Sequence, residues 1–269
     1  MEIEVHGCRY YVEVSGKGEP LLLLHGFTGN VDTWTETIAY LRDHYLCVTV
    51  DIIGHGKSSC PADEERYKME LVARDMIELM NKLGYAKLHL LGYSMGGRLA
   101  LTMAALFPDA VESLLLESTS PGLKTEEERL QRKKGDAALA ERIEREGMEA
   151  FIDYWQEIPL FATQRTLPSI QREAIRQQRL QNSVKGLSCS LKGMGTGSQP
   201  SWWEALPRLS MPVLLITGTE DKKFTKIAAE MARLLPSAVW KEINGAGHAI
   251  HVEDSAKFGT IIKEFLSHT

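Results

Sequence analysis

The sequence lacks the features that mark several classes of protein. It has four cysteines in 269 residues, and none of its apolar runs is long enough to cross a bilayer. Its net charge is −5, so it carries no surplus of positive charge. These absences argue against a disulfide-stapled secreted domain, a membrane-spanning protein and a nucleic-acid-binding protein.

The cysteines and the N-terminus point to one compartment. Cys8, Cys47, Cys60 and Cys189 are scattered, without a C-x-x-C pair or a metal-ligand spacing, so we expect buried free thiols. The first residues, MEIEVHGCRY, contain acids and no apolar run, unlike a signal peptide. We expect a cytoplasmic protein with a small-molecule substrate, no membrane insertion and no nucleic-acid partner. A monomer and a homo-oligomer both agree with the sequence.

What the sequence does contain is a repeated alternation of strand-like and helix-like segments. Residues 2–14 alternate as in a hairpin, and the apolar runs at 20–26 and 45–51 fit strands buried on both faces. Apolar residues recur at helical spacing over 66–84, and further strand–helix pairs lead to a final helix at 254–267. The alternation predicts an α/β fold with a mostly parallel central sheet flanked by helices.

The middle of the chain interrupts this alternation. Residues 124–181 are rich in Glu, Arg, Lys and Gln and contain no strand-like run. We therefore expect a helical cap at 121–199, inserted between two parts of a core at 1–120 and 200–269. The Gly-rich and then aromatic stretch at 192–206 fits either a flexible linker or an ordered return from the cap to the core.

The segment G-Y-S-M-G at 92–96 fits the nucleophile-elbow pattern G-x-S-x-G. It lies between a strand-like run, KLHLL, and a helix-like run, MGGRLALTMAALF, which is the context that an elbow requires. Gly92 and Gly96 allow a tight turn where a Cβ atom would clash. We therefore expect Ser94 at the carboxyl end of the sheet, with the following backbone N–H groups beside it.

A catalytic triad can be assembled from residues that follow predicted strands. A serine hydroxyl is activated when a histidine can take its proton, and His248 follows the last predicted strand. Asp221 follows the strand before, which gives the chain order Ser–Asp–His. Glu117 is a second candidate for the acid, but the glycine before Asp221 frees its loop to turn inward. His251 forms H-x-x-H with His248, but no third ligand is evident, so we expect no metal site.

The loop HGFTGN at 25–30 follows a predicted strand at the place where such folds supply an oxyanion donor. We expect the backbone amides of Phe27 and Met95 to form the oxyanion hole, and His25 to have a structural role. The segment DIIGHGKS at 51–58 resembles a phosphate-binding loop but has Asp51 where that loop requires glycine. We therefore expect no nucleotide and no other cofactor.

Arg98 is the unexpected residue of the elbow region. It falls in the first turn of the helix after Ser94, where a cation meets the positive end of the helix dipole. A guanidinium stays charged there and can bind a carboxylate through two parallel hydrogen bonds. A site for neutral esters has no use for such a group, so Arg98 predicts an anionic substrate. Most arginines of the cap, by contrast, should lie on solvated helix faces.

The segments LLLHGFTG, DIIGHGKSS, GYSMGGR, TGTEDKKF and GAGHAIHVE together resemble the α/β-hydrolase superfamily over nearly the whole chain. The cap segments FIDYWQEIPLF, RLQNS and LKGMGTGSQPSWW are similar to one family within it. This is the MenH family of menaquinone-pathway 2-succinyl-6-hydroxy-2,4-cyclohexadiene-1-carboxylate (SHCHC) synthases. The resemblance implies an α/β-hydrolase fold and a lyase that eliminates pyruvate from 2-succinyl-5-enolpyruvyl-6-hydroxy-3-cyclohexene-1-carboxylate.

The same resemblance implies a set of site residues. The triad Ser94, Asp221 and His248 would act as a base toward a carbon-bound proton. Five side chains would contact a substrate with several carboxylates: Tyr93, Arg98, Arg132, Trp155 and Arg179. The neighbouring Tyr154 is an alternative to Trp155, because the pair YW fits the family in either position.

Two other functions agree with these residues. Ser94 could serve as the nucleophile of a carbon–carbon or carboxylester hydrolase, or the fold could be a scaffold that only binds a ligand. The arginines favour the lyase, because caps that accept neutral acyl chains are apolar. The complete Ser–Asp–His set disfavours a protein that only binds.

Overall fold

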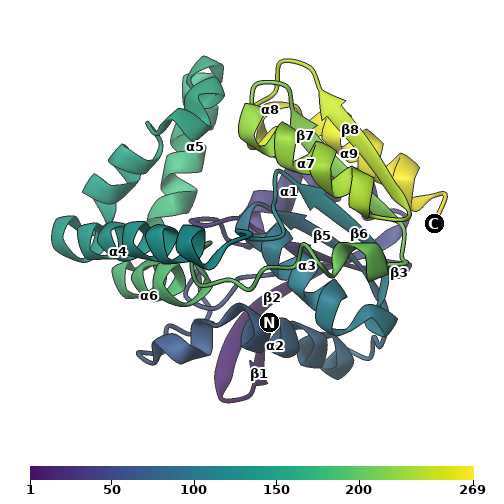
Figure 1. Ribbon diagram of the computed structural model, residues 1–269, viewed down its shortest axis with the longest axis horizontal. Helices are drawn as coiled ribbons and strands as arrows, with labels where there is room; N and C mark the ends of the chain where they lie inside the picture. The colour runs from purple at the N-terminus through teal and green to yellow at the C-terminus, as the bar shows by residue number, and fades with distance from the viewer.

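The core of the protein is one eight-stranded sheet, seen in the computed structural model, which describes all of residues 1–269 (Figure 1). The spatial order is β1-β2-β4-β3-β5-β6-β7-β8, antiparallel at the β1 and β2 edge and parallel from β4 to β8. The prediction of a mostly parallel sheet is therefore confirmed. The strands are β1 (Glu2–Val5), β2 (Cys8–Gly16), β3 (Glu19–Leu24), β4 (Tyr45–Val50), β5 (Leu88–Tyr93), β6 (Val111–Glu117), β7 (Val213–Gly218) and β8 (Ala238–Ile243).

Helices cover both faces of the sheet, because successive strand residues point to opposite sides. Leu22 and Leu24 belong to a hydrophobic cluster with α2, α3 and α7, whereas Leu21 and Leu23 belong to a second cluster with α1 and α9. Buried apolar side chains on both faces explain the uninterrupted hydrophobic runs in the sequence. The covering helices are α1 (Thr35–Leu41), α2 (Met69–Lys82), α3 (Met95–Leu106), α7 (Lys222–Leu234), α8 (Ile250–Glu253) and α9 (Ser255–Leu266).

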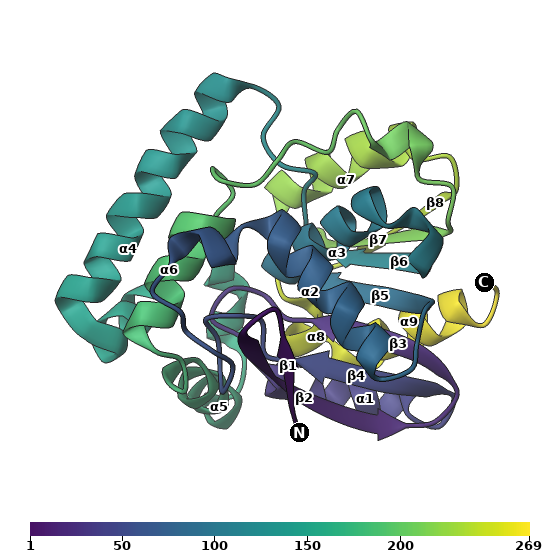
Figure 2. The same cartoon turned by 90° about the horizontal axis from the view of Figure 1, so that it is seen from below.

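The helical segment between β6 and β7 stands to one side of the sheet (Figures 1 and 2). It contains α4 (Glu126–Trp155), α5 (Ser169–Leu180) and α6 (Val184–Met194). Helix α4 is interrupted at Gly147, whose φ of +79° is outside the helical region. A small hydrophobic cluster holds α4 against α6, with Ile143, Phe151 and Leu187 fully buried. The expected helices of 124–181 are thus present.

The stretch at 192–206 is an ordered connection and not a flexible linker. Trp202 Nε1 donates to Thr102 Oγ1 at 2.9 Å, and Trp203 Nε1 donates to the Gly122 carbonyl at 2.9 Å. Both tryptophans thereby attach the return segment to the core and to the start of the cap. Each indole hydrogen bond fixes an aromatic ring that also packs on the main hydrophobic cluster.

One predicted element has different bounds in the structure. The helix expected over 66–84 is a short 3₁₀ turn at Glu64–Tyr67 followed by α2, because Lys68 between them is extended, with ψ of 131°. Elsewhere, no helix combines the length and the apolar character needed to cross a membrane.

Candidate active site

Ser94 occupies a strained turn between β5 and α3. Its φ of +50° and ψ of −106° are unusual for a residue with a side chain. The Ser94 N–H donates to the Glu117 carbonyl at 2.9 Å, and Thr119 Oγ1 donates to the Ser94 carbonyl at 2.9 Å. A Cβ atom on Gly96 would lie 2.0 Å from the Leu24 carbonyl oxygen, so this turn requires glycine there. The backbone therefore holds the serine hydroxyl beyond the end of the strand.

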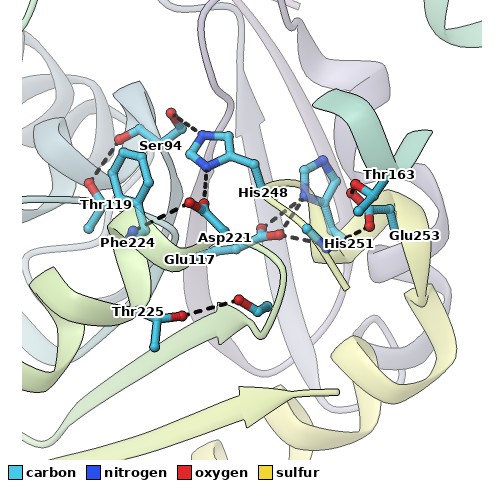
Figure 3. Close-up of polar contacts among 12 residues, drawn as sticks. Ser94, Glu117, Thr119, Thr163, Asp221, Phe224, Thr225, His248, His251 and Glu253 are labelled. Atoms are coloured by element: carbon cyan, nitrogen blue, oxygen red, sulfur yellow. Dashed lines mark hydrogen bonds and ion pairs between the residues drawn. The ribbon is translucent and has the colours of Figure 1, made fainter. Parts of the chain in front are cut away.

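Ser94, His248 and Asp221 form a continuous hydrogen-bonded chain (Figure 3). Ser94 Oγ lies 3.0 Å from His248 Nε2, and His248 Nδ1 lies 2.6 Å from Asp221 Oδ2. The histidine and the aspartate are both buried. Asp221 Oδ1 also accepts from the Phe224 N–H at 3.3 Å, which caps α7 and fixes the carboxylate. This arrangement can move a proton from the serine to the histidine.

Glu117, the other candidate acid, faces a different histidine. Its carboxylate lies 2.9 Å from His251 Nδ1 and accepts the His251 backbone N–H at 3.0 Å (Figure 3). Both residues are buried, and the ring of Tyr93 lies 4.5 Å from that of His251. The structure thus brings Asp221, and not Glu117, to His248.

Phe27 and Met95 both line the cavity next to Ser94. The Phe27 N–H donates no hydrogen bond to another backbone group, and Met95 is the first residue of α3, where an N–H has no partner within the helix. These two amides are therefore free to donate to an oxyanion beside Ser94. The site residues expected from the strand ends and from the loop after β3 lie together.

His25 sits under this loop in the structural position that the sequence suggested. Its Nε2 accepts from the Ile52 N–H at 3.0 Å, so its Nδ1 carries the proton and donates to the Gly26 carbonyl at 2.8 Å. Burial, together with the neighbouring His55, lowers the pKa of His25 to about 3. Burial also lowers the pKa of His55, whose ring centroid is 5.1 Å away, to about 4.

The cavity beside Ser94 has a volume of about 390 Å³ and lies between the core and the cap. Most of its wall is apolar, with Phe27, Leu139 and Trp155 among the contributors. Three cationic side chains line it, and no carboxylate does: Arg98, Arg132 and Lys223. An apolar cavity whose wall contains three cations and no carboxylate is suited to a ligand with several negative charges.

Arg98 is buried, with an exposed fraction of 9%, and has no carboxylate partner. Its Nη1 donates to the Met194 carbonyl at 2.8 Å and to Gln199 Oε1 at 2.9 Å, so residues at the end of the cap orient it. Burial, and next the charge of Arg132, lower the pKa of Arg98 to about 10. The guanidinium therefore still carries its charge at neutral pH.

The two cap arginines implied by the resemblance lie in different places. Arg132 lines the cavity beside Ser94, and its Nε donates to Asp136 Oδ1 at 2.7 Å. Arg179 lines a neighbouring cavity of about 570 Å³, which shares Phe27, Tyr93 and Phe161 with the first. The Arg179 guanidinium lies over the Phe161 ring, and its Nη1 is buried without a hydrogen-bond partner. The structure thus groups Arg98 with Arg132 and leaves Arg179 on the far side of this aromatic wall.

The aromatic residues of the pair YW face in different directions. Trp155 lines the cavity and packs edge-on against Phe27, with ring centroids 5.4 Å apart. Tyr154 is 40% exposed and stacks with the Arg142 guanidinium. Trp155 is therefore the one that reaches the cavity, together with Tyr93, whose ring lies 5.3 Å from that of His248.

Lys223 is the cavity residue that the motif analysis missed. It follows Asp221 by two residues, in the first turn of α7, and its ammonium group lies 5.2 Å from the centre of the Phe224 ring. The sequence contained a signal for it in TGTEDKKF, because a helix that begins at the acid of the triad presents its first turn to the same cavity. The sequence alone does not show which of Lys222 and Lys223 faces the cavity.

The sheet, the elbow and the hydrogen-bonded Ser–His–Asp chain define a class of protein, and sequence comparison agrees with it. Residues 19–255 match the family described as alpha/beta hydrolase fold. Among solved structures, MenH from S. aureus has a TM-score of 0.91 and 36% identity, covering 96% of this chain and 98% of that one. A malate-bound thermophilic esterase from Thermogutta terrifontis has a TM-score of 0.87 and 28% identity, covering 100% and 98%.

Proteins named for one activity are among the similar sequences. A Bacillus subtilis (strain 168) protein provisionally named 2-succinyl-6-hydroxy-2,4-cyclohexadiene-1-carboxylate synthase is 44% identical over 97% of this chain and 96% of its own. The synthase of that name from Pectobacterium atrosepticum is 30% identical over 92% and 94%. The chain belongs to this synthase family within the α/β-hydrolase fold.

Proposed function

We propose that the protein is an SHCHC synthase, a carbon–oxygen lyase of menaquinone biosynthesis that eliminates pyruvate from 2-succinyl-5-enolpyruvyl-6-hydroxy-3-cyclohexene-1-carboxylate. The observation that carries the proposal is the cavity beside Ser94, which has three cationic side chains and no carboxylate in its wall. A substrate with three carboxylates fits this charge, whereas a neutral ester leaves it uncompensated. The names of the related synthases support the same reaction. The malate bound by the T. terrifontis esterase shows that the same fold can hold a dicarboxylate.

The reaction begins with the loss of a carbon-bound proton next to the succinyl ketone. Ser94 Oγ, 3.0 Å from His248 Nε2, accepts this proton as its own passes to the histidine. Asp221, 2.6 Å from His248 Nδ1, stabilises the imidazolium that results. The electron pair of the broken C–H bond moves toward the ketone and forms an enolate.

The negative charge of the enolate then has to be stabilised until the leaving group departs. The Phe27 and Met95 amides donate to the enolate oxygen in this mechanism. As the enolate collapses, the ring gains its second double bond and the C–O bond to the enolpyruvyl group breaks. The leaving oxygen takes the electron pair and a proton, and the enol of pyruvate becomes pyruvate. No cofactor is needed, because the proton that is removed balances the proton that is returned.

The proposal includes a division of the chain into a core at 1–120 and 200–269 and a cap at 121–199. The cap has a hydrophobic cluster of its own, which includes Ala140, Phe151 and Leu191. It supplies Arg132 and Trp155 to the cavity, while the core supplies Ser94 and His248. We also infer a cytoplasmic location from the names of the related proteins, which are synthases of a polar carboxylate.

The direct test is to incubate the protein with the tricarboxylate precursor and to measure pyruvate. We expect pyruvate and the ring diene to appear in equal amounts. Ser94→Ala should lower kcat by about 10³-fold or more, because no hydroxyl then remains to accept the proton from the substrate and pass one to His248. The thermal unfolding temperature of this variant should stay near that of the wild type, which separates lost chemistry from lost folding.

The competing function is ester or carbon–carbon bond hydrolysis at the same serine. Its signature is fast turnover of p-nitrophenyl acetate without pyruvate release from the precursor. That outcome would replace the lyase with a hydrolase, in which Ser94 is acylated or activates water. Tight precursor binding without any turnover would instead indicate a protein that only binds.

A further inference from the structure

We propose that Lys223 binds a carboxylate of the substrate, distinct from the carboxylate bound by Arg98. The two residues stand on different helices, α7 and α3, and both line the cavity beside Ser94. The inference rests on the proposed function, because it assigns a partner to one carboxylate of that substrate.

The first argument is the position of the lysine. Nζ of Lys223 lies 5.2 Å from the centre of the Phe224 ring, and that ring lies 4.7 Å from the ring of His248. The Phe224 ring therefore lies next to both Lys223 and the histidine of the triad. A carboxylate bound by Lys223 would enter the same cavity that Ser94 and His248 line.

The second argument is electrostatic. Lys223 lies in the first turn of α7 and Arg98 in the first turn of α3, and a cation is unfavourable at the positive end of a helix dipole. Neither residue forms an ion pair with a carboxylate, although Asp136 attracts the charge of Arg98 and Asp221 that of Lys223. A bound polyanion would offset the charge of both cations and the positive ends of both helix dipoles. Ligand binding therefore explains why cations occupy these positions.

The groups that face Lys223 come from three elements. Arg98 on α3 and Arg132 on α4 repel its charge, whereas Asp221, the N-cap of α7, attracts it. Partial burial, and next the charge of Arg132, lower the pKa of Lys223. Asp136, which attracts Arg98, already accepts from Arg132 Nε at 2.7 Å and from the Gly197 N–H at 3.0 Å. The cluster therefore keeps a net positive charge that only a ligand can balance.

The chain offers a matched control in the adjacent residue. Lys222 has the same side chain, lies in the same helix turn and is exposed like Lys223, but it does not line this cavity. Lys223→Met and Lys222→Met therefore remove the same charge from the same helix end. Lys223→Arg restores a cation at the cavity with a different shape.

The experiment measures precursor turnover and, separately, malate binding by calorimetry for the wild type and these variants. Loss of a charge-assisted contact predicts that Lys223→Met raises KM for the precursor by about 10- to 100-fold, while Lys222→Met stays within about twofold of the wild type. Lys223→Arg should recover most of the KM. Malate, a dicarboxylate, should bind the wild type and Lys222→Met but bind Lys223→Met at least about tenfold more weakly.

The outcomes separate this inference from the function on which it rests. If the precursor releases no pyruvate with the wild type, yet Lys223→Met alone loses malate, the lyase assignment fails and the carboxylate site stands. Equal KM values and equal malate affinities in the two lysine variants would overturn the role of Lys223. A wild-type protein that binds no malate would overturn it as well.

Discussion

At the scale of single residues, the site combines a standard proton relay with cations that the relay does not need. Ser94, His248 and Asp221 provide the chemistry of many enzymes with this fold, so they do not by themselves select a substrate. Selection comes from Arg98, which is buried and lacks a carboxylate partner. An anion that enters the cavity can pair with this guanidinium directly.

Arg98 gives the most direct prediction at this scale. Arg98→Ala should lower kcat/KM for the precursor by an amount equivalent to about 2–4 kcal/mol, because the carboxylate that it binds is out of water. Arg98→Lys should also be poor, since an ammonium cannot make two parallel hydrogen bonds. Steady-state kinetics of pyruvate release will measure both.

The matched control is Arg145→Ala, which removes an exposed guanidinium whose ion pair is with Glu146 on α4. It should leave kcat/KM unchanged. Because Arg98 also holds the Met194 carbonyl and Gln199, thermal unfolding must show that Arg98→Ala is folded at the assay temperature. A folded Arg98→Ala with wild-type kcat/KM would remove the basis for an anionic substrate.

At the scale of elements, helix starts and strand ends position the site. The end of β5 and the start of α3 place Ser94, and the end of β7 and the start of α7 place Asp221 with Lys223. The turn between β5 and α3 brings Gly96 so close to the backbone of β3 that a side chain would not fit there. Its shape is therefore a property of two strands and a helix together.

This close approach predicts opposite effects for two glycine-to-alanine changes. Gly96→Ala should destabilise the protein by about 1–3 kcal/mol and lower kcat, because the new Cβ pushes α3 away from β3 and displaces Ser94. Gly135→Ala, in α4, should stabilise it by about 0.5–1 kcal/mol, because no atom lies within 4 Å of its new Cβ. Urea unfolding and pyruvate release measure both variants. Similar behaviour of the two would show that the elbow tolerates a Cβ.

The sequence predicts those parts of the site whose position depends only on which residues directly follow a strand. The elbow, the acid after β7 and the histidine after β8 each follow a strand, and a parallel sheet brings such positions to one edge. The placement of Arg179 was beyond prediction, because it depends on how α5 packs against the core. The same applies to Trp155 against Tyr154, since one step along α4 rotates a side chain from the cavity to solvent.

At the scale of the whole molecule, two buried histidines make stability depend on pH. The pKa of His25 is lowered to about 3 and that of His55 to about 4, chiefly by burial. In the unfolded chain both take up protons near their ordinary pKa of about 6.5. Their contribution to stability is therefore complete above about pH 6.5 and is lost as the pH falls toward the folded values.

The expected result is a free energy of unfolding that falls on acidification by up to about 1.4 kcal/mol per pH unit for each histidine. Urea unfolding at several pH values above and below about 6.5 measures this slope. His55→Gln should reduce the slope, because one of the two neutral imidazoles is gone. The same change at the exposed His268 should leave it as it is, and an identical slope in all three proteins would contradict the assignment.

The hydrogen bonds of Arg98 have a consequence for how this protein can be re-engineered. Its guanidinium is aimed by the carbonyl of the last residue of α6 and by Gln199, both of which belong to the cap side of the chain. Arg98 itself lies in the core, but the groups that orient its guanidinium lie about a hundred residues later in the chain. A chimera that exchanges α4 and α5 alone would keep this aim. One that exchanges the cap through residue 199 would replace both Met194 and Gln199 and so leave the arginine without its orienting partners.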